Sequence, residues 1–211
     1  MGYYILAFIC IFTTAGIHIY VSSSYNKYKK EPLNKKISGV ETANNILEEN
    51  DINNVYVIET KEELSDNYNP DKKVIRLSSD IFNGENVTSI AVASHISCHA
   101  IQYKEGNSFI KVMSLIFPFL RFSSQAGYII IVVGFIFRMF SFIYVGSVLI
   151  AIILVFLVIT LPIEFNASKR ALENLKKMNS VNEKEIIEVE KVLKATALAS
   201  IAGLTAIIKN F

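Results

Sequence analysis

Two histidines four residues apart, His95 and His99, are the residues of this chain best placed to carry out chemistry. On an α-helix, residues at this spacing lie on one face, one turn apart, so both imidazoles can reach a single Zn²⁺ ion. The third histidine, His18, lies inside an apolar stretch, and we interpret it as a packing or interfacial residue. Histidine pairs at helical spacing also arise by chance, so the pair alone does not identify a zinc site. Such a site requires a further ligand from elsewhere in the chain.

Glu164 is the candidate for that third ligand. It follows a long apolar run, where an ionisable side chain is costly unless it is paired or functional. Alternatively, Glu164 begins a helix and interacts favourably with the positive end of the helix dipole. The two interpretations are compatible, and the sequence leaves both open.

Ile96 occupies the position that a catalytic base would have beside such a histidine pair. In H-E-x-x-H zinc peptidases, the glutamate after the first histidine takes the proton from zinc-bound water as the peptide carbonyl is attacked. Here the stretch is His95-Ile96-Ser97-Cys98-His99. The pattern therefore predicts the ligand pair of such a helix without its glutamate.

The elements that must position these residues belong to a strongly apolar chain. Of its 211 residues, 52% are hydrophobic, and the mean hydropathy is +0.38, with the apolar residues clustered. We therefore predict an α-helical integral membrane protein with about four membrane helices. The net charge of +2 gives no indication of nucleic-acid binding, and Cys10 and Cys98 are too few for a disulfide framework. The candidate spans are residues 2–21, 126–140, 142–162 and 195–208, the last being the weakest.

Two apolar segments need a more specific interpretation. Residues 2–21 have no basic residue before their apolar core and no small-x-small cleavage pattern, which favours an uncleaved signal anchor. Residues 109–122 are interrupted by Pro118 and carry Lys111 and Arg121. We predict that this second segment is an interfacial or re-entrant piece.

Basic residues flank the predicted spans unevenly. They follow the first and third spans, whereas the hairpin between the second and third spans offers only Arg138. The positive-inside rule therefore places residues 22–108 and the segment after Pro162 in the cytoplasm, where the two can meet, and makes the protein a multi-pass protein of the cell membrane. The basic residues are Lys27, Lys29, Lys30, Lys35, Lys36, Lys169, Arg170, Lys176 and Lys177.

Residues 22–108 are predicted to form a small α+β segment that faces the cytoplasm. Capping side chains precede two helical patterns, and alternation of apolar and polar residues is typical of half-buried strands. The histidine pair falls on the second of these helices. The predicted elements are a helix from Ser38 to Glu49, strands at 53–60 and 73–77 on either side of a turn at 69–71, and a long helix from Asn86 to about Tyr103.

The remaining residues, 163–211, are predicted to be helical. One helix begins at Glu164 and ends near Met178, and a Ser180-x-x-Glu183 capping box starts the helix that runs into the last span. The chain thus divides into an anchor at 2–21, the α+β segment at 22–108, the interfacial piece and membrane hairpin at 109–162, and this C-terminal part.

Over nearly its full length, the chain resembles the neutral zinc metallopeptidases of bacterial membranes, the YugP-like family. The order of the matching motifs is specific. The motif that contains Glu164 is specific as well, and it also resembles the third-ligand helix of the HtpX-type membrane proteases. The matching pieces are Ser24-Tyr25-Asn26-Lys27-Tyr28, Ser38-Gly39, Leu64-Ser65-Asp66-Asn67-Tyr68-Asn69-Pro70, Val74-Ile75-Arg76-Leu77-Ser78, Ala91-Val92-Ala93-Ser94-His95, His99-Ala100-Ile101-Gln102 and Leu161-Pro162-Ile163-Glu164-Phe165-Asn166-Ala167-Ser168.

This resemblance implies a zincin-type, metallopeptidase-like fold for the α+β segment and peptide-bond hydrolysis as the activity of the family. It implies Zn²⁺ as the cofactor, with His95, His99 and Glu164 as its ligands. The lipid bilayer is then the expected partner, and unfolded or membrane proteins are the expected substrates.

The chain departs from the family pattern His-Glu-x-Gly-His at Ile96 and at Cys98. Isoleucine cannot accept a proton, and general-base catalysis typically contributes ~10²–10⁴-fold, so we expect impaired catalysis, as in a pseudoenzyme. Because no ligand is lost, zinc binding and hydrolysis are separable. Two residues are considered as replacements, Glu105 as a base and Cys98 as a ligand or reactive group. The alternative function is a non-enzymatic membrane scaffold or binding protein that retains the fold.

Overall fold

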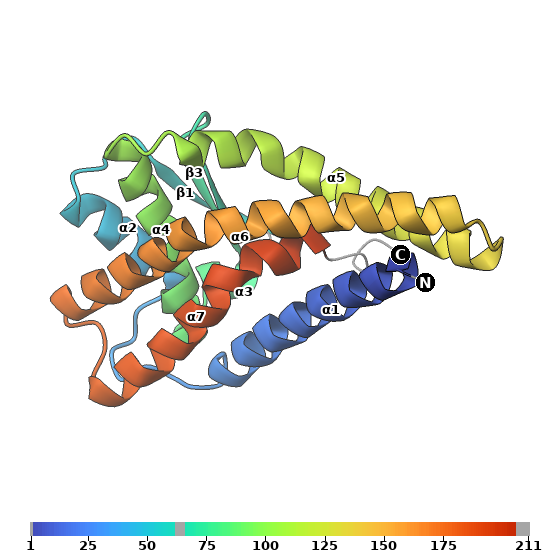
Figure 1. Cartoon of the computed structure of the whole chain (residues 1–211). Helices are drawn as coiled ribbons and strands as arrows, with labels where there is room; N and C mark the ends of the chain where they lie inside the picture. Colours follow the sequence, from blue (N-terminus) through green and yellow to red (C-terminus); the bar gives the residue numbers. More distant parts are fainter. Residues whose placement is uncertain (1, 62–65, 206–211) are drawn as a thin grey trace.

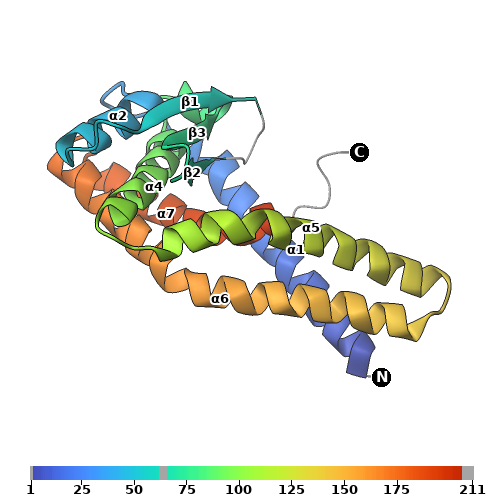
Figure 2. The same ribbon diagram turned by 90° about the horizontal axis from the view of Figure 1, so that it is seen from above.

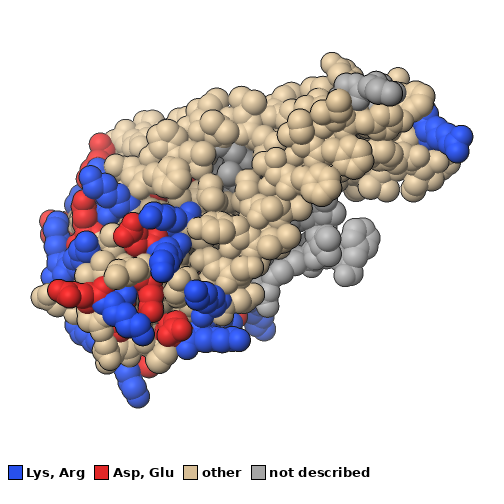
Figure 3. Space-filling model, turned by 60° about the horizontal axis from the view of Figure 1, so that its bottom comes forward, with Lys and Arg blue, Asp and Glu red and all other residues tan. Residues whose placement is uncertain are grey.

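The computed structural model describes residues 2–61 and 66–205, which form a compact head at one end of a set of long helices (Figures 1 and 2). Charged side chains gather on the head, whereas the long helices show basic side chains only at their far tip in this view (Figure 3). The elements are α1 (Gly2–Tyr28), α2 (Gly39–Glu49), β1 (Tyr56–Thr60), β2 (Asn67–Asn69), β3 (Val74–Ser78), α3 (Ser79–Phe82), α4 (Val87–Lys104), α5 (Phe109–Ile136), α6 (Phe140–Lys177) and α7 (Glu183–Thr205).

Three helices within the described residues are long and apolar enough to cross a membrane: Tyr4–Tyr28, Phe109–Ile136 and Phe140–Lys177. The described residues therefore offer three candidate spans, where about four were predicted for the chain. The fourth predicted span, 195–208, falls partly on α7, whose alanine-rich segment buries Ala195 and Ala197 against other helices; residues 206–208 lie outside the described part. These two alanines therefore pack inside the protein.

Helix α5 replaces two predicted elements, the interfacial piece at 109–122 and the short span at 126–140. Pro118 lies inside this 28-residue helix. Proline removes a backbone N–H, but long membrane helices tolerate this loss, so the break predicted there is absent. The chain turns instead between α5 and α6, three residues before the predicted break at Ser141, where Arg138 adopts a left-handed φ of 53°.

Helix α6 likewise continues through Pro162, so the prediction that a new helix begins at Glu164 is wrong. With 38 residues, α6 is about 57 Å long at 1.5 Å per residue, well beyond the ~30 Å thickness of the hydrocarbon core. Glu164 lies far from either end of this helix. Its carboxylate therefore has no helix N-terminus to stabilise, and the capping interpretation of this residue is also wrong.

The head combines a three-stranded sheet with helices α2 to α4. Strand β1 pairs with β3 in parallel, and β2 pairs with β3 antiparallel, in the order β1-β3-β2. The two predicted strands and the turn between them are confirmed with shifted limits, but β2 was not predicted because three residues are too few to show alternation. The predicted α2 helix is confirmed, with a capping box between Ser38 and Glu41.

Helix α4 runs through the centre of the head, in contact with α2, α6 and α7 (Figure 2). It begins after Asn86, whose side-chain oxygen accepts a hydrogen bond from the Ser89 backbone N–H at 3.0 Å, as predicted. Every residue from Val87 to Gln102 is buried. The histidine pair is therefore carried by the most enclosed helix of the head.

The turn between α6 and α7 is capped by other residues than predicted. Asn182 and Glu185 form the capping box, with the Asn182 N–H 2.8 Å from Glu185 Oε2 and the Glu185 N–H 2.9 Å from Asn182 Oδ1. The Ser180/Glu183 box is wrong because the turn, which includes a left-handed Asn179, extends two residues further. Glu185 Oε1 also accepts the Asn34 N–H at 2.7 Å, which joins this turn to the α1–α2 connection.

Glu185→Ala should destabilise the protein, because Glu185 is only 5% exposed and its carboxylate accepts from two backbone N–H groups. The substitution leaves both N–H groups without this acceptor. We expect a loss of about 1–3 kcal/mol, with the midpoint of thermal unfolding in detergent lower by about 2–4 °C per kcal/mol. Glu183→Ala, at an exposed position in the same turn of α7, is the matched control. Equal midpoints for the two variants would contradict this role of Glu185.

Candidate metal centre

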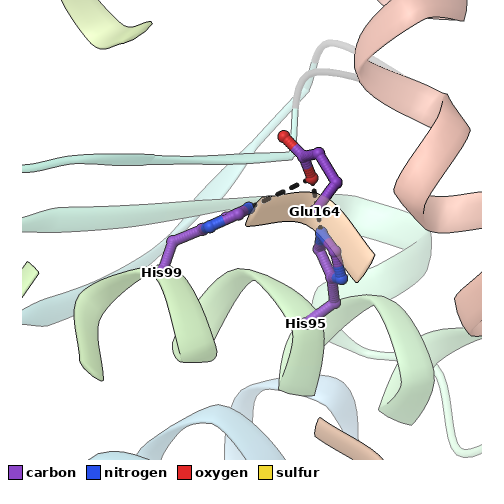
Figure 4. Close-up of side chains that lie close together, drawn as sticks. All are labelled: His95, His99 and Glu164. Atoms are coloured by element: carbon purple, nitrogen blue, oxygen red, sulfur yellow. Dashed lines mark hydrogen bonds and ion pairs between the residues drawn. The ribbon is translucent and has the colours of Figure 1, made fainter. Parts of the chain in front are cut away.

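His95 and His99 from α4 meet Glu164 from α6 in the interior of the head (Figure 4). Glu164 Oε2 lies 3.1 Å from His95 Nε2 and 3.5 Å from His99 Nε2. Ligand atoms of all three residues lie within 4.8 Å of one another. The exposed fractions are 1% for His95, 9% for His99 and 1% for Glu164, so the group is enclosed, with His99 on its more open side.

Ser168 determines which nitrogen of His95 carries the proton. Its hydroxyl donates to the Leu193 backbone carbonyl at 2.9 Å and lies 3.0 Å from His95 Nδ1. A hydroxyl has one proton to donate, so Ser168 Oγ accepts from His95 Nδ1–H. In the neutral imidazole, the lone pair of His95 is then on Nε2, the nitrogen that faces Glu164.

Gln102 has the same effect on His99. Its amide nitrogen donates to Asn166 Oδ1 at 2.9 Å and to the Ile163 carbonyl at 3.2 Å, both on α6. Its oxygen lies 3.0 Å from His99 Nδ1 and can only accept, so His99 Nδ1 carries the proton. The Nε2 lone pair of His99 therefore also points toward Glu164.

Three hydrogen-bond acceptors thus converge in a buried space, two neutral Nε2 atoms and a carboxylate oxygen, with no donor of their own between them. Such an arrangement is unfavourable unless a proton or a metal cation lies among the three. Two imidazoles and a carboxylate form the ligand set of a catalytic zinc site with an open fourth position. Ligands at about 2.0–2.1 Å from a tetrahedral ion are about 3.3–3.4 Å apart, a separation that the two measured distances bracket. These residues therefore fit a zinc ion.

The electrostatics of the two histidines differ. Burial lowers the pKa of His95, and this outweighs the opposing hydrogen bond with Glu164. Burial also disfavours the charged form of His99, but the nearby Glu164 carboxylate prevails and raises the pKa of His99 above its usual value. Of the two imidazoles, His99 therefore holds a proton on Nε2 more readily, and that proton has to leave for His99 Nε2 to bind a cation.

Ile96 lies within the hydrophobic core of the head and is 7% exposed. Among the described residues, Glu164 is the only carboxylate in the group that could hold a metal, and its oxygen faces both histidines. The position next to His95 where a base would act therefore carries an apolar side chain.

The two replacements considered from the sequence lie elsewhere. Glu105 is at the C-terminal end of α4, where both of its carboxylate oxygens accept from Arg170 Nη1 at 2.7 Å. The Cys98 thiol is buried beside Asn174, whose amide lies 3.9 Å from its sulfur, and burial raises the pKa of Cys98 to about 12. Neither residue belongs to the three-ligand group in this structure.

Sequence reasoning assigned no role to Ser168 or Gln102. Both had a local signal, because Gln102 follows His99 by three residues and Ser168 follows Glu164 by four, the two spacings that share a helix face. Only the packing of α4 between α6 and α7 shows that each of them contacts a histidine on its Nδ1 side.

Comparisons with known proteins identify the family of the chain. Residues 3–211 match the family described as "Putative neutral zinc metallopeptidase". The chain is 34% identical over 183 residues to "Putative membrane protease YugP" of Bacillus subtilis (strain 168), an alignment that covers 87% of this chain and 81% of that protein. No solved structure matches. With a family match over almost every residue and a membrane protease as a relative, this membrane protein belongs to the family of neutral zinc metallopeptidases.

Proposed function

We propose that this protein binds Zn²⁺ through His95, His99 and Glu164 and that its peptidase activity is weak or absent. The observation that carries the proposal is the convergence of three buried acceptors beside an isoleucine at the position of the base. The family match supports zinc and peptide-bond hydrolysis as the inherited chemistry. Because the base is lost but no ligand is, zinc binding can persist without peptide-bond hydrolysis.

Zn²⁺ in this position would polarise a peptide carbonyl and increase the acidity of water. The side chains around it would have the following separate roles. His95 and His99 direct their Nε2 lone pairs to one point, and the Glu164 carboxylate neutralises part of the charge of a cation there. Ile96 contributes an apolar side chain that can neither take the proton of an attacking water nor pass it to the leaving amine.

The cell-membrane topology belongs to the same proposal. The lysines that follow α1 and the basic residues near the end of α6 lie on the side of the head, which the positive-inside rule assigns to the cytoplasm. Glu164 lies on the helix that joins the membrane hairpin to the head. A substrate of this site would therefore be an unfolded chain or a membrane protein that reaches the cytoplasmic face of the bilayer.

Two rival functions make different predictions. A scaffold that keeps the fold without a metal would have to hold His95 Nε2, His99 Nε2 and the Glu164 oxygen that faces them together without a cation. An active peptidase would need a base other than Ile96, and the contacts of Glu105 with Arg170 and of Cys98 with Asn174 argue against the two candidates. The three alternatives are distinguished by metal content and by proteolysis.

The full-length protein, purified in detergent from metal-replete cells, should contain about one zinc ion per chain. His99→Ala should lose most of this zinc, because two ligands rarely suffice, whereas His18→Ala in α1 should keep it. Elemental analysis measures the content. Added zinc should also stabilise the parent, by about 2.7 kcal/mol at a hundred times the Kd, and His99→Ala much less. A parent that holds no zinc, and that is as stable as His99→Ala, would support the scaffold.

Ile96→Glu should restore a base and raise cleavage of an unfolded protein by ~10²–10⁴-fold over the parent, in a manner that a zinc chelator abolishes. Ile96→Gln is the matched control, with nearly the same shape as glutamate but no basic carboxylate. Cleavage is followed by the release of labelled peptides. Chelator-sensitive cleavage by the parent at the rate of Ile96→Glu would show that another base acts, and the proposal of impaired catalysis would then be wrong.

A further inference from the structure

Two buried residues outside the three-ligand group each contact one of its histidines. Ser168 is 7% exposed and Gln102 is 3% exposed. We propose that Ser168 and Gln102 are positioning residues for the metal, which hold both imidazoles as Nδ1–H tautomers with Nε2 directed at the ion. This inference rests on the proposed zinc site, and it adds the residues on which the affinity of that site depends.

Ser168 acts through its single hydroxyl proton. Because that proton is donated to the Leu193 carbonyl on α7, the oxygen presents a lone pair to His95 Nδ1 and selects the Nδ1–H tautomer. Without the hydroxyl, His95 Nδ1–H would lose this acceptor, and the Nε2–H tautomer, which cannot bind a metal through Nε2, would become competitive. Helix α7 thus takes part in ligand orientation although it supplies no ligand.

Gln102 acts on two ligands at once. Its oxygen accepts from His99 Nδ1–H, while its nitrogen donates to the residue before Glu164 and to Asn166, two residues after it. The side chain therefore fixes the turn of α6 that carries the carboxylate relative to the imidazole on α4. Substitution by leucine removes both effects, whereas glutamate keeps an acceptor for His99 but replaces the donor toward α6 by a charged carboxylate oxygen.

The geometry also offers a matched control for the loss of a buried hydroxyl. Ser97 on α4 is fully buried, and its hydroxyl donates to the Ala93 carbonyl of its own helix at 2.9 Å. Ser97→Ala and Ser168→Ala remove the same atom from two buried positions. Only the second of these hydroxyls contacts a histidine of the metal group.

The test measures the zinc affinity of the full-length protein in detergent by competition with a chromogenic chelator, together with the visible absorption spectrum of the Co²⁺-substituted protein. Ser168→Ala and Gln102→Leu should bind zinc ~10–100-fold more weakly than the parent and shift the Co²⁺ bands. Gln102→Glu should bind zinc more tightly than Gln102→Leu, because it keeps the acceptor at His99 Nδ1, and Ser97→Ala should match the parent in both measurements.

Failure of this inference is distinguishable from failure of the zinc site. A parent that binds zinc tightly, with Ser168→Ala and Gln102→Leu both equal to Ser97→Ala, would overturn the positioning role and leave the site intact. A parent that binds no zinc would overturn both. If Ser168→Ala does not fold, the pair Gln102→Leu and Gln102→Glu decides, since equal affinities for these two variants would contradict the requirement for an acceptor at His99 Nδ1.

Discussion

The structure of this protein depends on one electrostatic constraint, the approach of the Glu164 carboxylate to two imidazole nitrogens inside a closed core. Such a group is stable only if something positive compensates it and if the helices that carry it cannot separate. α4 and α6 meet this requirement because α4 is buried on all sides and packs against α6 and α7. The fold of the head can therefore be understood as the support of one charged contact.

Helix α6 connects that contact to the membrane. The same continuous helix passes from the apolar hairpin with α5, through Pro162, to Glu164 and Ser168. Because α6 is continuous, its apolar half beside α5 and the turn that carries Glu164 belong to one element, and packing against α4 sets where the carboxylate lies. An independent helix that began at Glu164 would have required a loop in the most enclosed part of the site.

The parts of the fold that sequence reasoning predicted are those decided by local chemistry. The caps at Ser38 and Asn86 follow from short-range hydrogen bonds, and the histidine spacing on α4 is a property of a single helix turn. The continuity of α5 and α6 through their prolines was not predictable in this way, because neighbouring helices decide whether a missing N–H breaks a helix. The capping box of Asn182 and Glu185 was also not predictable from local sequence, since Glu185 is held there by a hydrogen bond from Asn34 in a distant segment.

Ile96 stands where H-E-x-x-H helices carry a glutamate, and its apolar side chain has a physical consequence for the buried group of charges. A carboxylate at this buried position would add a second negative charge beside Glu164, and its burial would require the metal ion or a proton as a partner. Isoleucine needs no such partner, and it packs within the hydrophobic core of the head. Meanwhile Ser168 and Gln102 still commit their buried hydrogen bonds to the two histidines. The polar network of this protein is thus organised around the ligands, and its stability is independent of the group that would turn a bound metal into a hydrolytic catalyst.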